Sequence, residues 1–323
     1  MNVARNEHRL LQEARLAGQG AVLLCAILWS TSGLFIKLLD WHPVVISGGR
    51  SILAAGVLFA LRCISAGRKT GTENISKNNP GNNSEINSRA CKNAFLKTLE
   101  LAGFGCFYAA TMILFVIANK LTASANAILL QYAAPMWTAL LGWLVLKEKP
   151  RWEHWFALVL VGIGLFLVLS GGLSKGSIAG DIIALLSGVA FAGNSVVLRL
   201  KKDGNPADIL LFSHIICALF SVPFFILYPP VMDTGSVFSI VFMGIFQIGA
   251  ASALFAYGLK RVPAIQAMLT ATIEPVLNPV WVLLVTGEKP ALSVLTGGSL
   301  IIAAVVFSSV KRYIPRFRFF PQR

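Results

Sequence analysis

Two charged residues, Glu274 and Arg50, stand inside long apolar stretches where ionised groups are rare. An Asp, Lys or Arg at the centre of a membrane helix costs about 2.5 to 3.5 kcal/mol, so such a charge faces a cavity or a partner. Glu274 could bind a substrate ammonium group or a proton, and Arg50 could pair with Glu274 or with a substrate carboxylate. The alternative is a structural ion pair that ties two helices together.

The depths of the two charges bring them to a similar level. With about 1.5 Å of rise per residue, Arg50 lies about 9 Å from the outer end of its stretch and Glu274 about 16 Å from the inner end of its own. In a hydrocarbon core about 30 Å thick, these depths differ by about 5 Å. An Arg side chain is long enough to bridge that difference.

Further polar side chains in the apolar stretches could complete an amphipathic pocket with aromatic walls. Each of them could instead make a hydrogen bond between helices. A lone intramembrane His does not make a metal site, and we expect no metal or cofactor. The candidates are Trp29, Ser30, Ser32, Tyr108, Gln131, Tyr132, Asn194, His214, Gln247 and Tyr257.

Prolines mark the middle of two of these stretches. Pro135 and Pro275 each remove the hydrogen bond to the carbonyl four residues earlier, at Gln131 and Ala271. A kinked helix with a free carbonyl is suited to lining a cavity, although the prolines could equally serve helix geometry alone. Pro279 adds a second break in the later stretch.

Composition assigns the apolar stretches to a membrane. Apolar residues make up 56% of the chain and charged residues 13%, with a mean hydropathy of +0.71, whereas soluble domains are about 25% charged. Lipid forces each span to close its own backbone hydrogen bonds as a helix, which excludes a soluble two-domain enzyme. The ten candidate spans are 18–39, 44–64, 97–118, 122–146, 152–171, 178–200, 207–228, 236–258, 263–286 and 291–310.

The basic residues predict the orientation of these spans. A net charge of +14 in a soluble protein would suggest a nucleic-acid partner. Here 23 of the 28 Lys and Arg residues fall in the tails and connections of one membrane side and four on the other, with Arg50 inside a span. Because basic loops stay in the cytoplasm, we expect a multi-pass plasma-membrane protein with both termini cytoplasmic and no nucleic-acid partner.

An internal repeat divides the spans into two groups of five. Residues 127–150 align with 267–290 without a gap, and eight of the 24 positions are identical, including Pro135 with Pro275 and Glu148 with Glu288. An offset of 162 pairs Gly18 with Gly180, Trp29 with Phe191 and Lys37 with Arg199. Because five is odd, the second half enters the membrane upside down, and such inverted repeats suit alternating access.

The repeat also distinguishes residues that both halves need for their structure from residues that occur in one half only. Glu274 aligns with Ala134, and the nearest counterpart of Arg50, at an offset of 163, is Ser213, so each charge occurs in one half only and a functional role is favoured. Glu148 and Glu288 occur in both halves, so we interpret them as structural elements that order the turn after a helix.

These features resemble the EamA-type members of the drug/metabolite transporter superfamily. The resemblance rests on Gly142-Trp-Leu-Val-Leu-Lys-Glu-Lys-Pro150, on Glu274-Pro-Val and Gly287-Glu-Lys-Pro290, on Trp29-Ser30 and on Arg50, and it covers residues 18–310. It implies a ten-helix permease with a central cavity and cytoplasmic termini that often exports amino acids or other small metabolites.

The domain organisation follows from the spans and the repeat. Residues 65–96 are rich in Asn, Ser, Gly and Lys, so we expect a disordered cytoplasmic loop. The predicted fold is all-α, with ten transmembrane helices as two inverted five-helix repeats. The segments are an N-terminal tail (1–17), the first repeat (18–171), the second repeat (178–310) and a C-terminal tail (311–323).

We therefore predict a transporter of a small organic metabolite, an amino acid or related compound, that acts as an exporter with a possible coupling proton. An importer or exchanger of another solute remains the alternative. A channel would need a pore-lining ring of charges, and an intramembrane enzyme would need a motif such as HExxH or GxSxG, which none of the ten spans contains. The expected partners are the substrate and the lipid bilayer, with the chain a monomer or weak homodimer.

Overall fold

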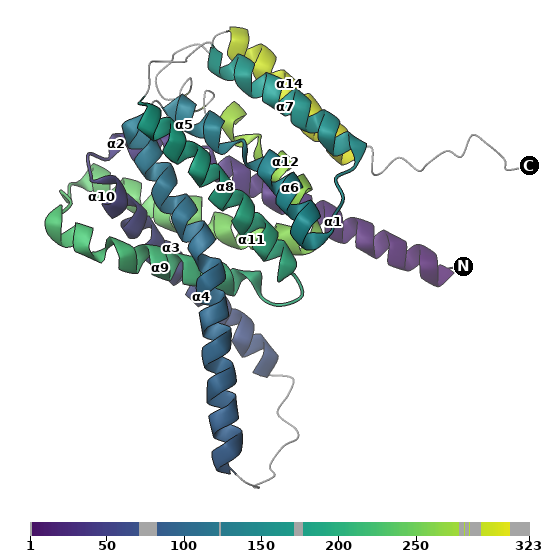
Figure 1. Ribbon diagram of the computed structural model, residues 1–323, viewed down its shortest axis with the longest axis vertical. Helices are drawn as coiled ribbons and strands as arrows, with labels where there is room; N and C mark the ends of the chain where they lie inside the picture. The colour runs from purple at the N-terminus through teal and green to yellow at the C-terminus, as the bar shows by residue number, and fades with distance from the viewer. Residues whose placement is uncertain are drawn as a thin grey trace, which may run out of the picture.

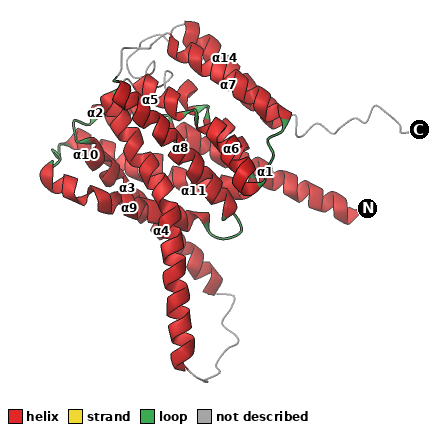
Figure 2. Ribbon diagram, viewed as in Figure 1, coloured by secondary structure: helices red, strands yellow, loops and turns green. Residues whose placement is uncertain are grey.

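The chain folds into packed helices, as expected from its apolar spans. The computed structural model describes residues 2–70, 83–122, 124–170, 177–277, 281, 284 and 292–310, and within these residues it contains no strand. Figure 2 shows this all-helical character. Six helices are long and apolar enough to cross a membrane, and four shorter apolar helices accompany them. The prediction of an all-α polytopic membrane protein with ten spans in two inverted repeats is confirmed.

The helices of the two halves follow one another along the chain (Figure 1). The first half contains α1 (Asn2–Trp29), α2 (Ser32–Leu38), α3 (Pro43–Thr70), α4 (Asn83–Leu121), α5 (Ser124–Gln131), α6 (Ala134–Leu146) and α7 (Trp152–Ser170). The second half contains α8 (Ile178–Leu200), α9 (Pro206–Leu227), α10 (Thr234–Phe242), the π-helix η1 (Met243–Ala250), α11 (Ala251–Arg261), α12 (Ala264–Ala271) and α14 (Leu292–Val310).

Three of the predicted spans are interrupted near their middle. The first span breaks between α1 and α2, the fourth between α5 and α6, and the ninth at Thr272–Ile273, where helix resumes over 274–277. Pro135 and Pro275 are each the second residue after a break, where a proline fits because the first turn has no intrahelical use for its N–H. Pro279 lies outside the described residues.

The eighth span contains an irregularity that the sequence analysis did not predict. Its middle, Met243–Ala250, is a π-helix that joins α10 to α11 without a break. A π-helical turn widens the backbone and rotates the following side chains, and such turns often occur at functional sites. Gln247 and Ile248 lie within it.

Helix packing in the structure obeys a pseudo-twofold relation between the halves. The contact of α1 with α11 corresponds to that of α8 with α4, and the contact of α3 with η1 corresponds to that of α9 with α4. The pairs α3 with α9 and α7 with α14 join equivalent helices, and Figure 1 shows α7 and α14 side by side along one edge.

Two glycines fix this relation at the level of single residues. A Cβ on Gly18 would lie 2.7 Å from Cβ of Arg261, and a Cβ on Gly180 would lie 3.0 Å from Cβ of Leu121. Gly18 and Gly180 are separated by 162 residues, and Leu121 and Arg261 by 140, which are the two offsets of the sequence repeat. Both contacts therefore need a residue without a side chain so that the helices can approach closely.

The helices extend further from the membrane than expected. The 65–96 segment was predicted to be a disordered loop, and in the structure α3 continues to Thr70 and α4 begins at Asn83, so helices include 65–70 and 83–96. Residues 71–82 lie outside the described part, as do 311–323. Extending an existing helix adds one hydrogen bond per residue without a new nucleation cost, which offsets the polar composition. The 2–17 segment is likewise continuous with α1.

The close approach at Gly180 predicts a stability difference between two glycine positions. Gly180→Ala places a methyl group about 3 Å from Thr122 and Leu121, so we expect a loss of about 1 to 3 kcal/mol through overpacking and a lower melting temperature in detergent. Gly20→Ala is the matched control, because nothing lies within 4 Å of its Cβ position. Equal melting temperatures for the two variants would contradict the tight contact.

Candidate functional site

A central cavity lies where the interrupted spans of both halves meet. Its wall is formed by residues at the helix breaks and by residues from α3, α4, α8 and η1. Two charged side chains, four aromatic side chains and several polar groups belong to it. The lining residues are Trp29, Ser32, Arg50, Tyr108, Thr111, Met112, Phe115, Gln131, Phe191, Ile248 and Glu274.

Arg50 reaches the cavity from the second turn of α3 and is 1% exposed. Its Nη2 lies 4.0 Å from the Met112 sulfur, and its Nε has no hydrogen-bond partner. Among the described residues, the ion pairs closer than 4.0 Å do not include Arg50. A buried guanidinium that keeps an unused donor can bind an anion that enters the cavity.

Glu274 reaches the same cavity from the first turn after the ninth-span break. Tyr132, at the equivalent break in the other half, places its hydroxyl 2.5 Å from Oε2 of Glu274 and 2.9 Å from the Ala271 carbonyl oxygen. Of the two pairings considered for Arg50, a direct ion pair with Glu274 is absent from the described contacts, although both residues line the cavity. The depths of Arg50 and Glu274 along their spans predicted a similar level in the membrane. The packing of the helices keeps the two side chains apart at that level.

An aromatic cluster closes one wall of the cavity. The Trp29 ring lies 5.4 Å from that of Phe191 and 5.1 Å from that of Phe255, and the two Phe rings are 5.7 Å apart. Trp29 and Phe191 are repeat equivalents that meet across the pseudo-twofold axis. The indole Nε1 of Trp29 and the hydroxyl of Tyr108 have no hydrogen-bond partner, so both are available as donors.

Two other predicted residues, Gln131 and Ser30, make hydrogen bonds at or next to the cavity wall. The Gln131 side-chain amide donates to Ser187 (3.0 Å) while Gln131 also lines the cavity. Ser30 accepts a hydrogen bond from the Trp281 indole (2.6 Å) and donates to the Ile27 carbonyl.

Three more predicted residues are fully buried outside the cavity wall. His214 is fully buried between the hydroxyls of Ser51 (3.4 Å) and Ser252 (3.2 Å). Gln247 donates to Thr31 (3.4 Å) from the π-helix, and the side-chain nitrogen and oxygen of Asn194 are buried without a partner.

Tyr257 is not brought to the cavity. It is 42% exposed, and the Arg261 guanidinium lies 3.4 Å from its ring centroid. This pair sits one helical turn apart on the outer face of α11, where the ring and the cation stack.

Sequence reasoning missed several apolar cavity residues. Met112, Phe115, Phe191 and Ile248 line the wall without a polar atom that singles them out in a hydrophobic span. The repeat could have found Phe191, because it is the counterpart of Trp29. Thr111 was missed because a Thr in a membrane helix commonly bonds its own backbone, and here it donates to the Phe107 carbonyl.

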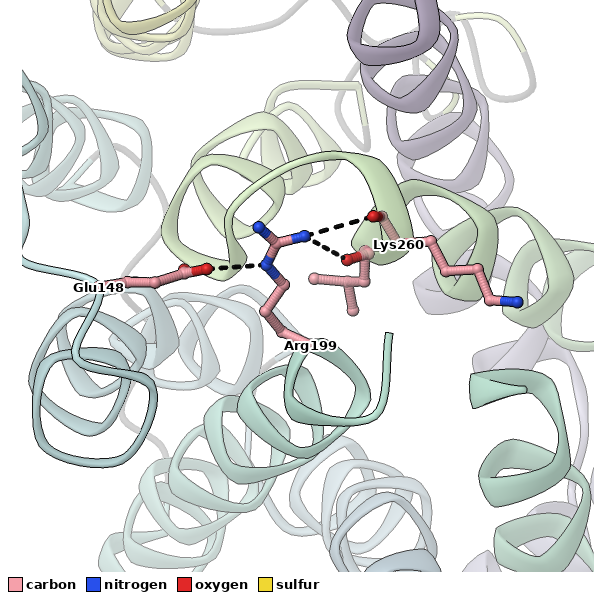
Figure 3. Close-up of polar contacts among 4 residues, drawn as sticks. Glu148, Arg199 and Lys260 are labelled. Carbon is pink, nitrogen blue, oxygen red and sulfur yellow. Dashed lines mark hydrogen bonds and ion pairs between the residues drawn. The ribbon is translucent and has the colours of Figure 1, made fainter. Parts of the chain in front are cut away.

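A second polar cluster joins three helix ends away from the cavity (Figure 3). The guanidinium of Arg199, in the last turn of α8, donates from Nε to Glu148 Oε1 (2.8 Å) and from Nη1 to the carbonyls of Leu259 (3.2 Å) and Lys260 (3.4 Å). Figure 3 shows the Lys260 side chain directed away from this cluster. Arg199 thus provides donors for carbonyls at the end of α11, which lack partners within the helix.

Two pseudo-symmetric halves around a charged central cavity define a polytopic transporter of the inverted-repeat class. Residues 16–170 and 178–310 each match the EamA-like transporter family. The chain belongs to this family, and it is a membrane transporter of the EamA type, as the resemblance predicted.

Individual relatives support the same assignment. The chain is 31% identical over 152 residues to the uncharacterized transporter YwfM of Bacillus subtilis (strain 168), a match that covers 44% of this chain and 50% of that protein. It is 28% identical over 209 residues to an uncharacterized transporter of Archaeoglobus fulgidus, covering 64% and 75% of the two chains. Solute carrier family 35 member G1 of Mus musculus is 27% identical over 224 residues, covering 64% and 54%.

A solved structure shares the fold. It superposes with a TM-score of 0.69 at 19% sequence identity and covers 94% of this chain and 99% of its own.

The cluster around Arg199 predicts an energetic coupling that a surface pair lacks. Arg199→Gln and Glu148→Gln should each lower the melting temperature in detergent, and the double variant should lose less than the sum, with a coupling of about 0.5 to 3 kcal/mol. The control is the exposed pair Arg9 and Glu13, with side chains 78% and 56% exposed, for which the coupling should be near zero. Additive losses at Arg199 and Glu148 would contradict the interaction.

Proposed function

We propose that this transporter exports a small zwitterionic metabolite, an amino acid or related compound, across the plasma membrane by alternating access. The observation that carries the proposal is a single cavity lined by one buried cation, Arg50, and one buried carboxylate, Glu274, without an ion pair between them. Opposite charges that are buried and not paired with each other suit a ligand that carries both.

Three side chains of the cavity offer hydrogen-bond donors to the carboxylate of such a substrate. Arg50, Trp29 and Tyr108 line the cavity, and the Arg50 Nε, the Trp29 Nε1 and the Tyr108 hydroxyl are buried without a hydrogen-bond partner. A carboxylate offers about four lone-pair sites, so one group can accept from all three donors. A hydrogen bond to a charged group contributes about 1.5 to 3 kcal/mol, which makes Arg50 the principal anchor.

The rest of the substrate is constrained by charge and wall chemistry. Glu274 supplies a carboxylate for an ammonium group, and Trp29, Phe191 and Met112 offer apolar surface to a side chain. A sugar phosphate or nucleotide sugar would call for several buried cations, and among the described cavity residues Arg50 is the one cation.

Alternating access is supported by the pseudo-twofold packing and by the cluster around Arg199. Three of the segments rich in basic residues, 147–151, 199–202 and 260–261, meet at that cluster, so the charge rule assigns it to the cytoplasmic end. We infer that the hydrogen bonds of Arg199 hold this end closed and must break when the cavity opens to the cytoplasm. Both termini are then cytoplasmic, and the chain acts as a monomer or weak homodimer.

Transport in liposomes tests the substrate class. We expect purified protein to catalyse saturable counterflow of amino acids, which distinguishes a permease from a channel. Arg50→Met should lower the apparent substrate affinity about 10- to 100-fold, because it removes a charged hydrogen-bond donor, and Glu274→Gln should weaken amines similarly.

Two comparisons make this assay decisive. Tyr257→Phe is the control, because the exposed Tyr257 lies outside the cavity wall and its loss of a hydroxyl should leave counterflow unchanged. Equal transport of a substrate analogue that lacks the carboxylate, or normal affinity in Arg50→Met, would overturn the zwitterion assignment.

Labelling of single cysteines tests the orientation. In a background with all five cysteines replaced by serine, Met232→Cys and Asp203→Cys place thiols on exposed residues in the α9–α10 and α8–α9 connections. A membrane-impermeant maleimide should label the cysteine at 232 in intact cells and the one at 203 only after permeabilisation. The reverse pattern would place the termini outside.

A further inference from the structure

The Tyr132 hydroxyl stands between two oxygen atoms at the ninth-span break. One is the Ala271 carbonyl oxygen (2.9 Å) and the other is Oε2 of Glu274 (2.5 Å). A phenol carries one proton to donate, and a carbonyl can only accept. If Tyr132 donates to Ala271, the hydrogen in the other contact must come from a protonated Glu274. If Glu274 is ionised, Tyr132 donates to it and leaves the carbonyl.

The Ala271 carbonyl has a specific need for this donor. Pro275 stands four residues later and has no N–H, so the usual helical partner of this carbonyl is missing. Ala271 is fully buried, and a buried carbonyl without a donor is destabilising. The Tyr132 hydroxyl therefore serves either the backbone at the break or the carboxylate, according to whether Glu274 holds a proton.

The Ser30 hydroxyl also has one proton and two hydrogen-bonding neighbours, but its arrangement is fixed. Ser30, at the first-span break, donates its one proton to the Ile27 carbonyl (2.6 Å) and accepts from the Trp281 indole (2.6 Å). There the neighbour is a permanent donor, so the arrangement has one state. At Tyr132 the neighbour is a carboxyl group, which donates only when protonated.

Among the described contacts, no cationic side chain neutralises the charge of an ionised Glu274. Tyr132 contacts it directly, and among the described residues Cys25 of α1 and Tyr108 of α4 interact with it electrostatically. Arg50 of α3 lines the same cavity without an ion pair to it. The group that balances an ionised Glu274 therefore enters the cavity, as a proton or as a substrate ammonium group.

We propose that Glu274 is the coupling-proton site and that Tyr132 is a positioning residue that transmits its protonation to the helix break at Ala271. When a substrate ammonium group binds Glu274, the carboxyl proton leaves to cavity water, and the Tyr132 hydrogen turns from the Ala271 carbonyl to the carboxylate. Proton and substrate then occupy one carboxylate alternately, which gives exchange of the two. This exchange rests on the proposed function, whereas the hydrogen-bond switch does not.

Infrared spectroscopy of the full chain in liposomes tests the switch without any substrate. We expect a pH-dependent carbonyl stretch of a protonated carboxylic acid that is lost in Glu274→Gln. In Tyr132→Phe the band should shift to higher wavenumber, because the acid loses its acceptor, and its titration midpoint should move. Tyr257→Phe is the matched control, with a tyrosine hydroxyl lost outside the cavity wall, and should leave the band unchanged.

The outcomes separate the switch from the transport assignment. An absent Glu274 band, or a band and midpoint unaffected by Tyr132→Phe, would overturn the switch. If Tyr132→Phe does not fold, a tyrosine C–O band of the wild-type protein should shift with the same pH midpoint as the Glu274 band and stay constant in Glu274→Gln, and a tyrosine band that ignores the Glu274 midpoint would overturn the switch. A switch that is intact while no amino acid undergoes counterflow would reject the proposed substrate, and counterflow unaffected by a pH gradient would reject the exchange.

Discussion

Hydrocarbon offers no hydrogen-bond partner to a peptide group, and this constraint decides where the chain departs from helix. Each break exposes carbonyls that need new donors, and at the first-span and ninth-span breaks hydroxyl groups supply them. Ser30 donates to Ile27, and Thr31 donates to Leu28.

The ninth span follows the same rule with help from the other half. Thr272 donates to the Leu269 carbonyl within its own segment, whereas the Ala271 carbonyl is reached by Tyr132 from the opposite repeat. A cavity can form at these breaks because the freed backbone groups are satisfied there. The breaks that allow the cavity therefore also link the two halves across it.

The polar clusters around Arg199 and Arg50 have different roles. Around Arg199 the guanidinium makes an ion pair and two bonds to carbonyls, so the cluster joins helix ends. Around Arg50 a donor stays unpaired, and the described side-chain hydrogen bond of its guanidinium is to a thioether. Symmetry explains the difference, because the repeat supplies a common scaffold and the cavity charges were added in one half only.

Much of the architecture could be predicted because its causes are local. Span length, the cost of charge in lipid and the odd number of spans per repeat each act along the chain, and the repeat offsets reappear in the packing of Gly18 and Gly180. The helical extensions on either side of residues 71–82 were missed because composition measures average polarity. It does not register the cooperativity of a helix already begun in the membrane.

The sequence by itself determined which residues are costly in lipid, where prolines interrupt helices and that the halves are inverted, because these properties depend on residue type and order. Only the tertiary structure decided which of these residues contact each other. The depth of Arg50 and Glu274 gives one coordinate, whereas their lateral separation depends on how ten helices pack. Tyr132 meets Glu274 across 142 residues of chain, a contact that no local pattern encodes, because it exists only when the two halves close around the same cavity.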